Sequence, residues 1–110
     1  MSLPALFLSH GSPTLVIEPS AARTFIEGLS GLLPHPRAIL VVSAHFNAPR
    51  PTLTAARQPD TIHDFGGFPD ALYQLQYPSL GAHDLAEDVA DLLRDAGFDA
   101  ATDGERGLDH

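Results

Sequence analysis

The sequence predicts an α/β fold in which a central sheet with parallel strands is flanked by helices. Two continuous apolar runs, residues 3–8 and 38–42, are bounded by turn residues, as is typical of strands covered on both faces. Between them, residues 20–33 carry apolar side chains at helical spacing, with Ser20 as the expected N-cap and Pro34 as the stop. This strand–helix–strand order indicates a parallel pair joined by a crossover.

Three more elements are expected in the second half of the chain. Residues 52–56 predict a third, shorter strand, and residues 98–102 predict a returning strand. Residues 83–96 predict a helix that ends in a left-handed C-cap at Gly97. The side chains expected to be buried on this helix are Leu85, Val89, Leu92, Leu93 and Ala96.

Length and composition predict one small globular domain. The chain has 110 residues, of which 44% are hydrophobic and 18% are charged, so a disordered or fibrous chain is excluded. Residues 104–110 read as a loop, with no closing helix or strand after them. We therefore interpret residues 1–110 as a single, truncated domain fragment.

Charge and cysteine content exclude several classes of function. The net charge is −8, and the basic residues are six arginines with no lysine, which disfavours broad binding to nucleic acid or to anionic membranes. The absence of cysteine excludes disulfides and thiolate metal sites. No apolar stretch approaches the roughly 20 residues of a membrane span, so a cytoplasmic location is the default expectation. The oligomeric state is left open.

Each of the first two apolar runs leads into a turn that contains a histidine. His10 lies in the motif Ser-His-Gly-Ser-Pro at residues 9–13, and His45 lies in Ser-Ala-His-Phe at residues 43–46. Loops that leave parallel strands emerge at one edge of the sheet, so the two imidazoles are expected to be neighbours although they are 35 residues apart. From this pattern alone, a metal ligand and a turn-capping loop histidine are equally open for His10.

Four motifs, taken in order, resemble the 4,5-DOPA extradiol dioxygenase family. They are the two histidine turns, Thr-Ile-His-Asp-Phe-Gly-Gly-Phe-Pro at residues 61–69, and Gly-Leu-Asp-His at residues 107–110. This family belongs to the class III extradiol ring-cleaving dioxygenases related to the B subunit of protocatechuate 4,5-dioxygenase. The resemblance covers nearly all of this chain but less than half of a typical member, and it implies the N-terminal part of a catalytic domain.

The resemblance implies a metal-dependent enzyme that opens the aromatic ring of a catechol such as DOPA with O2. Family members bind Fe(II), or zinc in some bacterial proteins as isolated, through the histidines that correspond to His10 and His45. Two imidazoles and one harder ligand leave positions open for both catechol oxygens and for O2. The third ligand and the usual acid/base histidine lie downstream in the family, so this chain alone is expected to be weakly active or inactive.

Other residues are assigned to the substrate side of the implied site. His63 is expected in the pocket wall or as a residue that orients the loop, rather than as a direct ligand. Phe65 and Phe46 are candidates for contact with an aromatic ring, with core packing equally open. His110 matches the histidine of the family's Asp-His-Gly motif, which lies near the substrate, and it is the candidate catalytic residue.

Several polar residues near these motifs are assigned structural roles. Ser43 is expected to bond its own turn, and Asp64 to cap the turn that follows it. His35, between two prolines, and His83, near a helix start, are expected to be ordinary surface residues.

Two alternatives of other classes stay open. Sirohydrochlorin-type chelatases also place His-Gly-Ser after their first strand, but they do not share Ser-Ala-His at residues 43–45 or the segment 61–69. A non-enzymatic remnant that binds metal or a partner protein is the other alternative, by analogy with partner-binding relatives of the superfamily.

Overall fold

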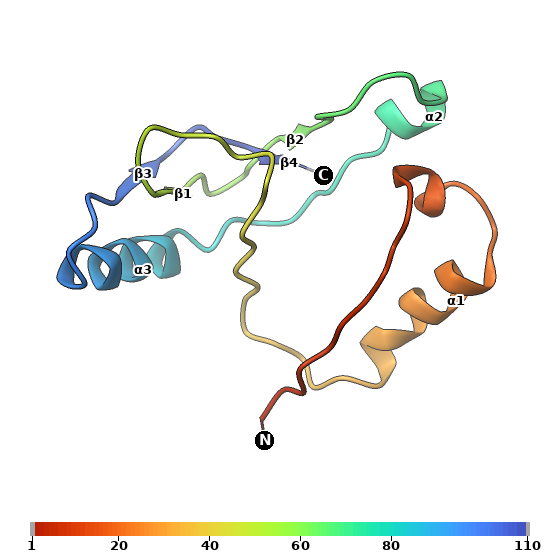
Figure 1. Ribbon diagram of the computed structural model, residues 1–110, viewed down its shortest axis with the longest axis horizontal. Coiled ribbons are helices and arrows are strands. Elements are labelled where there is room, and N and C mark those ends of the chain that lie inside the picture. Colours follow the sequence, from red (N-terminus) through yellow and green to blue (C-terminus); the bar gives the residue numbers. More distant parts are fainter. Residues whose placement is uncertain (1, 110) are drawn as a thin grey trace. The chain divides into compact units, whose positions relative to one another are not determined.

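The computed structural model describes residues 2–109, which form two units (Figure 1). The first unit comprises Met1–Ile39 and Gly67–Leu75, and the second comprises Leu40–Gly66 and Gln76–His110. Helices and parallel strand pairs both occur, so the predicted α/β class is confirmed.

The first unit is built from short helices. It contains a 3-10 turn, η1 (Pro13–Val16), the helix α1 (Ala21–Gly28), a second 3-10 turn, η2 (Leu29–Gly31), and the single turn α2 (Asp70–Tyr73). Ser20 is the N-cap of α1 as predicted, because its side-chain oxygen accepts a hydrogen bond of 3.0 Å from the backbone N–H of Arg23. The helix ends five residues earlier than residue 33 and tightens into η2, which lies before Pro34.

The second unit carries the strands. The strands β1 (Thr52–Thr54) and β3 (Ala101–Asp103) pair in parallel, and so do β2 (Thr61–Ile62) and β4 (Leu108–Asp109). The helix α3 (His83–Asp95) lies in the connection between β1 and β3 and contacts both strands (Figure 1). Parallel strands need such a crossover, because a tight hairpin cannot join them.

Small side chains let α3 approach the strand pair closely. The helix buries Ala86 and Ala90, and the residues buried around the strands include Ala55, Ala56 and Ala100. The larger side chains predicted for this face are less buried, and Leu92 is 67% exposed. The predicted helix is confirmed to within one residue, and Gly97 follows it with a φ of 95°, but the buried face is rotated towards the alanines.

Two predicted strands are wrong. Residues 3–8 and 38–42 are not strands in the structure, and their apolar side chains are mostly exposed, with Phe7 at 100% and Val42 at 95%. A strand forms only where a neighbouring strand accepts and donates its backbone hydrogen bonds, and neither segment has such a neighbour among residues 2–109. An apolar run therefore indicates that a segment tends to be buried. The segment becomes a strand only where a neighbouring strand pairs with it.

No helix among the described residues is long and apolar enough to cross a membrane.

Candidate functional site

The start of β4 depends on a close approach of two backbones. Leu108 N–H donates to the Asp60 carbonyl oxygen at 2.7 Å, and a Cβ at Gly107 would clash with that same oxygen. Six residues, 55–60, separate β1 from β2, but only four, 104–107, separate β3 from β4. Glycine at position 107 lets the shorter connection bring β4 against the Asp60 segment.

The turn before β4 is closed by a carboxylate. Asp103 accepts hydrogen bonds from the backbone N–H groups of Glu105, at 2.8 Å, and Arg106, at 2.9 Å. These two bonds, with the nearby charge of Arg106, lower the pKa of the Asp103 carboxyl and outweigh a small effect of desolvation. This turn places Arg106, and after it β4, at the candidate site.

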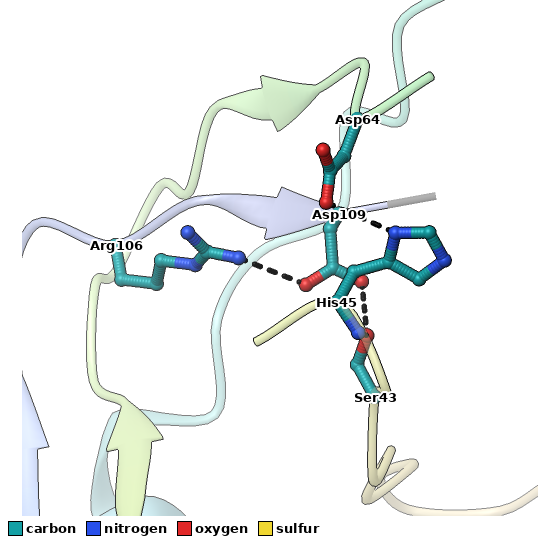
Figure 2. A network of polar contacts seen from close by, with 5 residues as sticks. All are labelled: Ser43, His45, Asp64, Arg106 and Asp109. Atoms are coloured by element: carbon teal, nitrogen blue, oxygen red, sulfur yellow. Dashed lines mark hydrogen bonds and ion pairs between the residues drawn. The ribbon is translucent and has the colours of Figure 1, made fainter. Parts of the chain in front are cut away.

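His45 and Asp64 form the central pair of this site (Figure 2). Nδ1 of His45 lies 2.9 Å from Oδ2 of Asp64, and about half of each side chain is exposed. A carboxylate can only accept a hydrogen bond, so Nδ1 carries a proton, and the neutral ring has its lone pair on Nε2. The expected turn-capping role of Asp64 is therefore replaced by a bond to the histidine, 19 residues away in sequence.

The turn that carries His45 is fixed from two sides. Ser43 Oγ accepts from the His45 N–H at 3.1 Å, as predicted for a serine that bonds its own turn. The same hydroxyl donates to Oδ1 of Asp109 at 2.5 Å, a short hydrogen bond at the lower limit for a hydroxyl on a carboxylate. This second bond links the turn to the end of β4 (Figure 2).

Arg106 completes the network. Its Nη2 donates to Oδ2 of Asp109 at 3.0 Å, and its guanidinium carbon lies 4.5 Å from the centre of the Phe46 ring. Burial raises the pKa of the Asp109 carboxyl, but the hydrogen bonds from Ser43 and Arg106, with the charge of Arg106, bring it below its ordinary value. Asp109 is thus ionised although its side chain is only 7% exposed.

The residues predicted for the substrate side lie in the second unit. The rings of His63 and Phe65 meet edge to face with centres 5.9 Å apart, and both residues are half-buried. Phe46 is also half-buried, and the guanidinium of Arg106 covers one of its faces. The candidate catalytic residue, His110, lies outside the described residues.

His10 lies in the first unit, in an exposed turn before η1. Gly11 follows it with a φ of 65°, and Ser12 caps η1 by accepting from the Thr14 N–H at 3.3 Å. His10 lines a shallow hollow with Ser12, Thr14 and Glu18, among others. His10 and His45 belong to different units, so their convergence stays a prediction. Within residues 2–109, no three His, Asp or Glu side chains are grouped to hold a metal ion.

Two other histidines were assigned to the surface. His35 is exposed, as predicted. His83 is half-buried, and its Nδ1–H donates to the Ala55 carbonyl oxygen at 2.8 Å, so the prediction of an ordinary surface residue is wrong. This bond ties the first turn of α3 to the residue after β1.

Sequence reasoning assigned no role to Arg106 or Asp109 and misassigned Asp64. A signal was present in each motif, because a carboxylate directly adjoins a histidine in His63-Asp64 and in Asp109-His110. Metal-binding histidines commonly donate their second ring N–H to a carboxylate, so a conspicuous aspartate in a motif is a candidate partner.

Comparison with known proteins gives one consistent family. The family model described as the catalytic LigB subunit of aromatic ring-opening dioxygenase matches residues 4–110. A relative in Escherichia coli (strain K12), named 4,5-DOPA dioxygenase extradiol, is 46% identical over 109 residues, which is 98% of this chain and 40% of that protein. Relatives of the same name in Beta vulgaris and Mirabilis jalapa are 42% and 39% identical, each over 94% of this chain and 40% of the relative. The chain thus spans about 40% of the length of these relatives.

Proposed function

This chain belongs to the family of the catalytic LigB subunit of aromatic ring-opening dioxygenases, and on that premise we propose that it forms the first part of a metal-dependent extradiol dioxygenase that opens a catechol ring with O2. The relatives named 4,5-DOPA dioxygenase extradiol support a catechol such as DOPA as the substrate. That this chain is a single fragment of the catalytic domain, and that it works in the cytoplasm, also belong to the proposal.

The observation that carries the proposal is the state of His45. Histidines that bind metal through one ring nitrogen almost always donate the other N–H to a carboxylate, a carbonyl or water. Asp64 holds the His45 ring in this way and directs the lone pair to Nε2. The donor chemistry therefore fits Fe(II), with zinc as the alternative ion, because both accept neutral imidazole.

His10 is proposed as the second ligand. Its turn is exposed and Gly11 has a backbone conformation that L side chains rarely adopt, so the turn presents the imidazole without a bulky neighbour. Once bound, the metal would supply a Lewis acid that binds the catechol oxygens and O2 together. The two histidines hold and orient that ion, and they leave further coordination positions to other donors.

His63, Phe65 and Phe46 are proposed to contact the aromatic substrate. The edge-to-face contact between His63 and Phe65 fixes both rings at the half-buried surface of the second unit. The guanidinium of Arg106 covers one face of Phe46, so a substrate ring is expected to meet its edge or its other face. His110 is proposed to act near the substrate, with its role resting on the motif alone.

A chimera tests the proposal directly. This chain would replace the matched segment of the Escherichia coli relative, and ring cleavage of DOPA would be followed after loading with Fe(II) without oxygen. We expect ring cleavage by the chimera, and its loss in the His10→Ala and His45→Ala versions. The 110-residue chain assayed alone should show weak or absent turnover, because two ligands hold a transition metal loosely. A chimera that folds and binds iron but never cleaves a catechol would refute the proposal.

The His35→Ala chimera is the matched control. His35 is an exposed histidine in the first unit, between two prolines and away from the four motifs. Its removal should leave both iron content and ring cleavage unchanged. A loss equal to that of His10→Ala would show that the assay reports general damage to the chain.

A further inference from the structure

The turn that carries His45 has little structure of its own. Its two internal hydrogen bonds join the His45 N–H to Ser43 Oγ, at 3.1 Å, and the Phe46 N–H to the Ser43 carbonyl oxygen, at 3.4 Å. Both residues 44 and 45 are exposed. A turn with few internal hydrogen bonds at the solvent surface opens readily, so its geometry depends on the contacts that the rest of the chain makes with it.

Asp109 is an anchor for the residue two positions before His45. Its carboxylate accepts from the Ser43 hydroxyl on one oxygen and from Arg106 on the other, and Figure 2 shows it between these two residues. A nearly buried carboxylate is costly unless it is paired, and here both oxygens have donors. The hydrogen bond from Ser43 therefore offsets part of the free-energy cost of burying the Asp109 charge.

Arg106 is an anchor for the residue that follows His45. Its guanidinium lies over the ring of Phe46, and its Nε is buried without an acceptor among residues 2–109. Among residues 2–109, Asp109 and the Phe46 ring both contact the guanidinium and help to hold it in place. Both flanks of His45 thus lead to the same Arg106–Asp109 pair.

The pair is itself held firmly. Asp109 lies in β4, which pairs with β2, and Arg106 lies in the turn closed by Asp103. The exposed pair Arg50–Asp99, at 3.3 Å, has no such support, since 52% and 82% of these side chains are exposed. The Arg106–Asp109 pair is a built feature of the second unit, distinct from an ordinary surface ion pair.

The geometry points to Arg106 and Asp109 as positioning residues that clamp the His45 turn from both flanks, while Asp64 orients the His45 ring. One part of this inference rests on the proposed function: that the clamp serves to hold a metal ligand, His45, in place. Neither residue is proposed as a metal ligand; they would act on metal affinity through the backbone of residues 43–46. Substitution of residues that orient a ligand typically lowers metal affinity about 10- to 100-fold.

Two measurements on the 110-residue chain test the clamp. The first is amide hydrogen exchange at His45 and Phe46, which needs no metal, and the second is zinc affinity. In Asp109→Asn we expect exchange at both amides to be about tenfold faster, which corresponds to the loss of a charged hydrogen bond, and zinc affinity to fall about tenfold. The amides of α3 should stay protected, which shows that the unit remains folded.

Matched variants separate the clamp from general damage. Asp99→Asn removes the same charge from the exposed pair with Arg50 and should change neither measurement. Ser43→Ala should reproduce the loss, whereas Ser43→Thr, which keeps a hydroxyl, should largely restore both values. If Asp109→Asn loses the protection of the α3 amides, the comparison of Ser43→Ala with Ser43→Thr tests the clamp instead, because Ser43→Ala removes only one hydroxyl.

The outcomes distinguish the clamp from the proposed function. Unchanged exchange at His45 and Phe46 in both Asp109→Asn and Ser43→Ala would overturn the clamp, whatever the chain binds. Faster exchange with unchanged zinc affinity would overturn its role in metal binding, provided that His45→Ala abolishes zinc binding. If His45→Ala leaves zinc affinity intact, the metal-site proposal fails, and the exchange data alone then confirm or overturn the clamp.

Discussion

The two histidine turns follow the same sequence pattern, yet the structure holds them differently. His45 lies in a turn that is bonded to residues up to 66 positions away, through Ser43 and Asp109, and its ring is bonded to Asp64. The turn of His10 is shaped by local features, namely Gly11 and the cap that Ser12 places on η1. An apolar run followed by a histidine turn therefore predicts a candidate ligand, but long-range carboxylates decide how firmly that ligand is held.

The difference follows from the parallel strand pairs of the second unit. Pairing of β2 with β4 brings the segments that carry Asp64 and Asp109 into one neighbourhood. The first unit has no strand pair among its described residues, so its helices give His10 no comparable partner.

Of the changes considered, Gly107→Ala should have the largest effect on the stability of the strand pair that anchors the His45 turn. The added Cβ would clash with the Asp60 carbonyl oxygen and force β4 away from β2, at a cost of about 1–3 kcal/mol, typical of overpacking. Chemical denaturation should show the loss of stability, and hydrogen exchange should show the loss of protection at Leu108. Gly104→Ala, in the same turn, meets no atom within 4 Å and should be nearly neutral. Equal effects of the two changes would contradict the close-approach account.

Asp64→Asn should weaken metal binding while leaving the fold intact. The amide offers a weaker acceptor to Nδ1 of His45, so zinc affinity should fall about 10- to 100-fold. Isothermal titration measures the change. Asp60→Asn serves as the control, because the backbone carbonyl of Asp60 accepts a hydrogen bond whereas its exposed side chain makes none among residues 2–109. Full affinity in Asp64→Asn would show that this carboxylate does not support the ligand.

His83→Ala should lower the free energy of unfolding by about 1 kcal/mol, the usual net value of one hydrogen bond. The bond to the Ala55 carbonyl oxygen joins α3 to β1, so the loss should appear in the second unit. His35→Ala, in the exposed loop of the first unit, should change stability little. A result in which His35→Ala costs as much as His83→Ala would contradict the assigned contacts.

The smallest effect concerns Asp103 at low pH. Its pKa in the folded chain lies below the ordinary value near 3.8, so its contribution to stability is full above about pH 4 and is lost as the pH falls through the folded pKa. The amide shifts of Glu105 and Arg106 should follow this titration by NMR. A midpoint at or above 3.8 would contradict the bonds that close this turn.

Local sequence signals predicted the starts of α1 and α3 and the end of α3, whereas η1 and α2 were not predicted. Ser20 supplies a polar N-cap for α1, and Gly97 supplies the left-handed residue after α3, because both are properties of a few adjacent residues. The strand β1 was also expected, within residues 52–56. By contrast, residues 3–8 and 38–42 carry an apolar pattern whose outcome depends on a distant partner, which a local pattern does not specify.

The candidate site was predicted only at the level of single residues. Of the residues that the motifs selected, His45, His63, Phe65 and Phe46 lie in the second unit and His10 lies in the first, while His110 lies outside the described residues. The partners of His45 were missed because β4 has two residues and no strand-like pattern, so the pairing that places Asp109 left no periodic signal. Asp64 was assigned to its neighbouring turn because sequence reasoning favours local partners for short polar side chains.

The proposed function depends on the binding of one metal ion by both His10 and His45. Titration of the 15N-labelled chain with zinc, followed by NMR of the imidazole nitrogens, tests this claim most directly. We expect a ring nitrogen of His10 and Nε2 of His45 to shift together and to reach completion at one zinc per chain. Shifts that saturate at different zinc ratios, or a His45 ring that never responds, would contradict it.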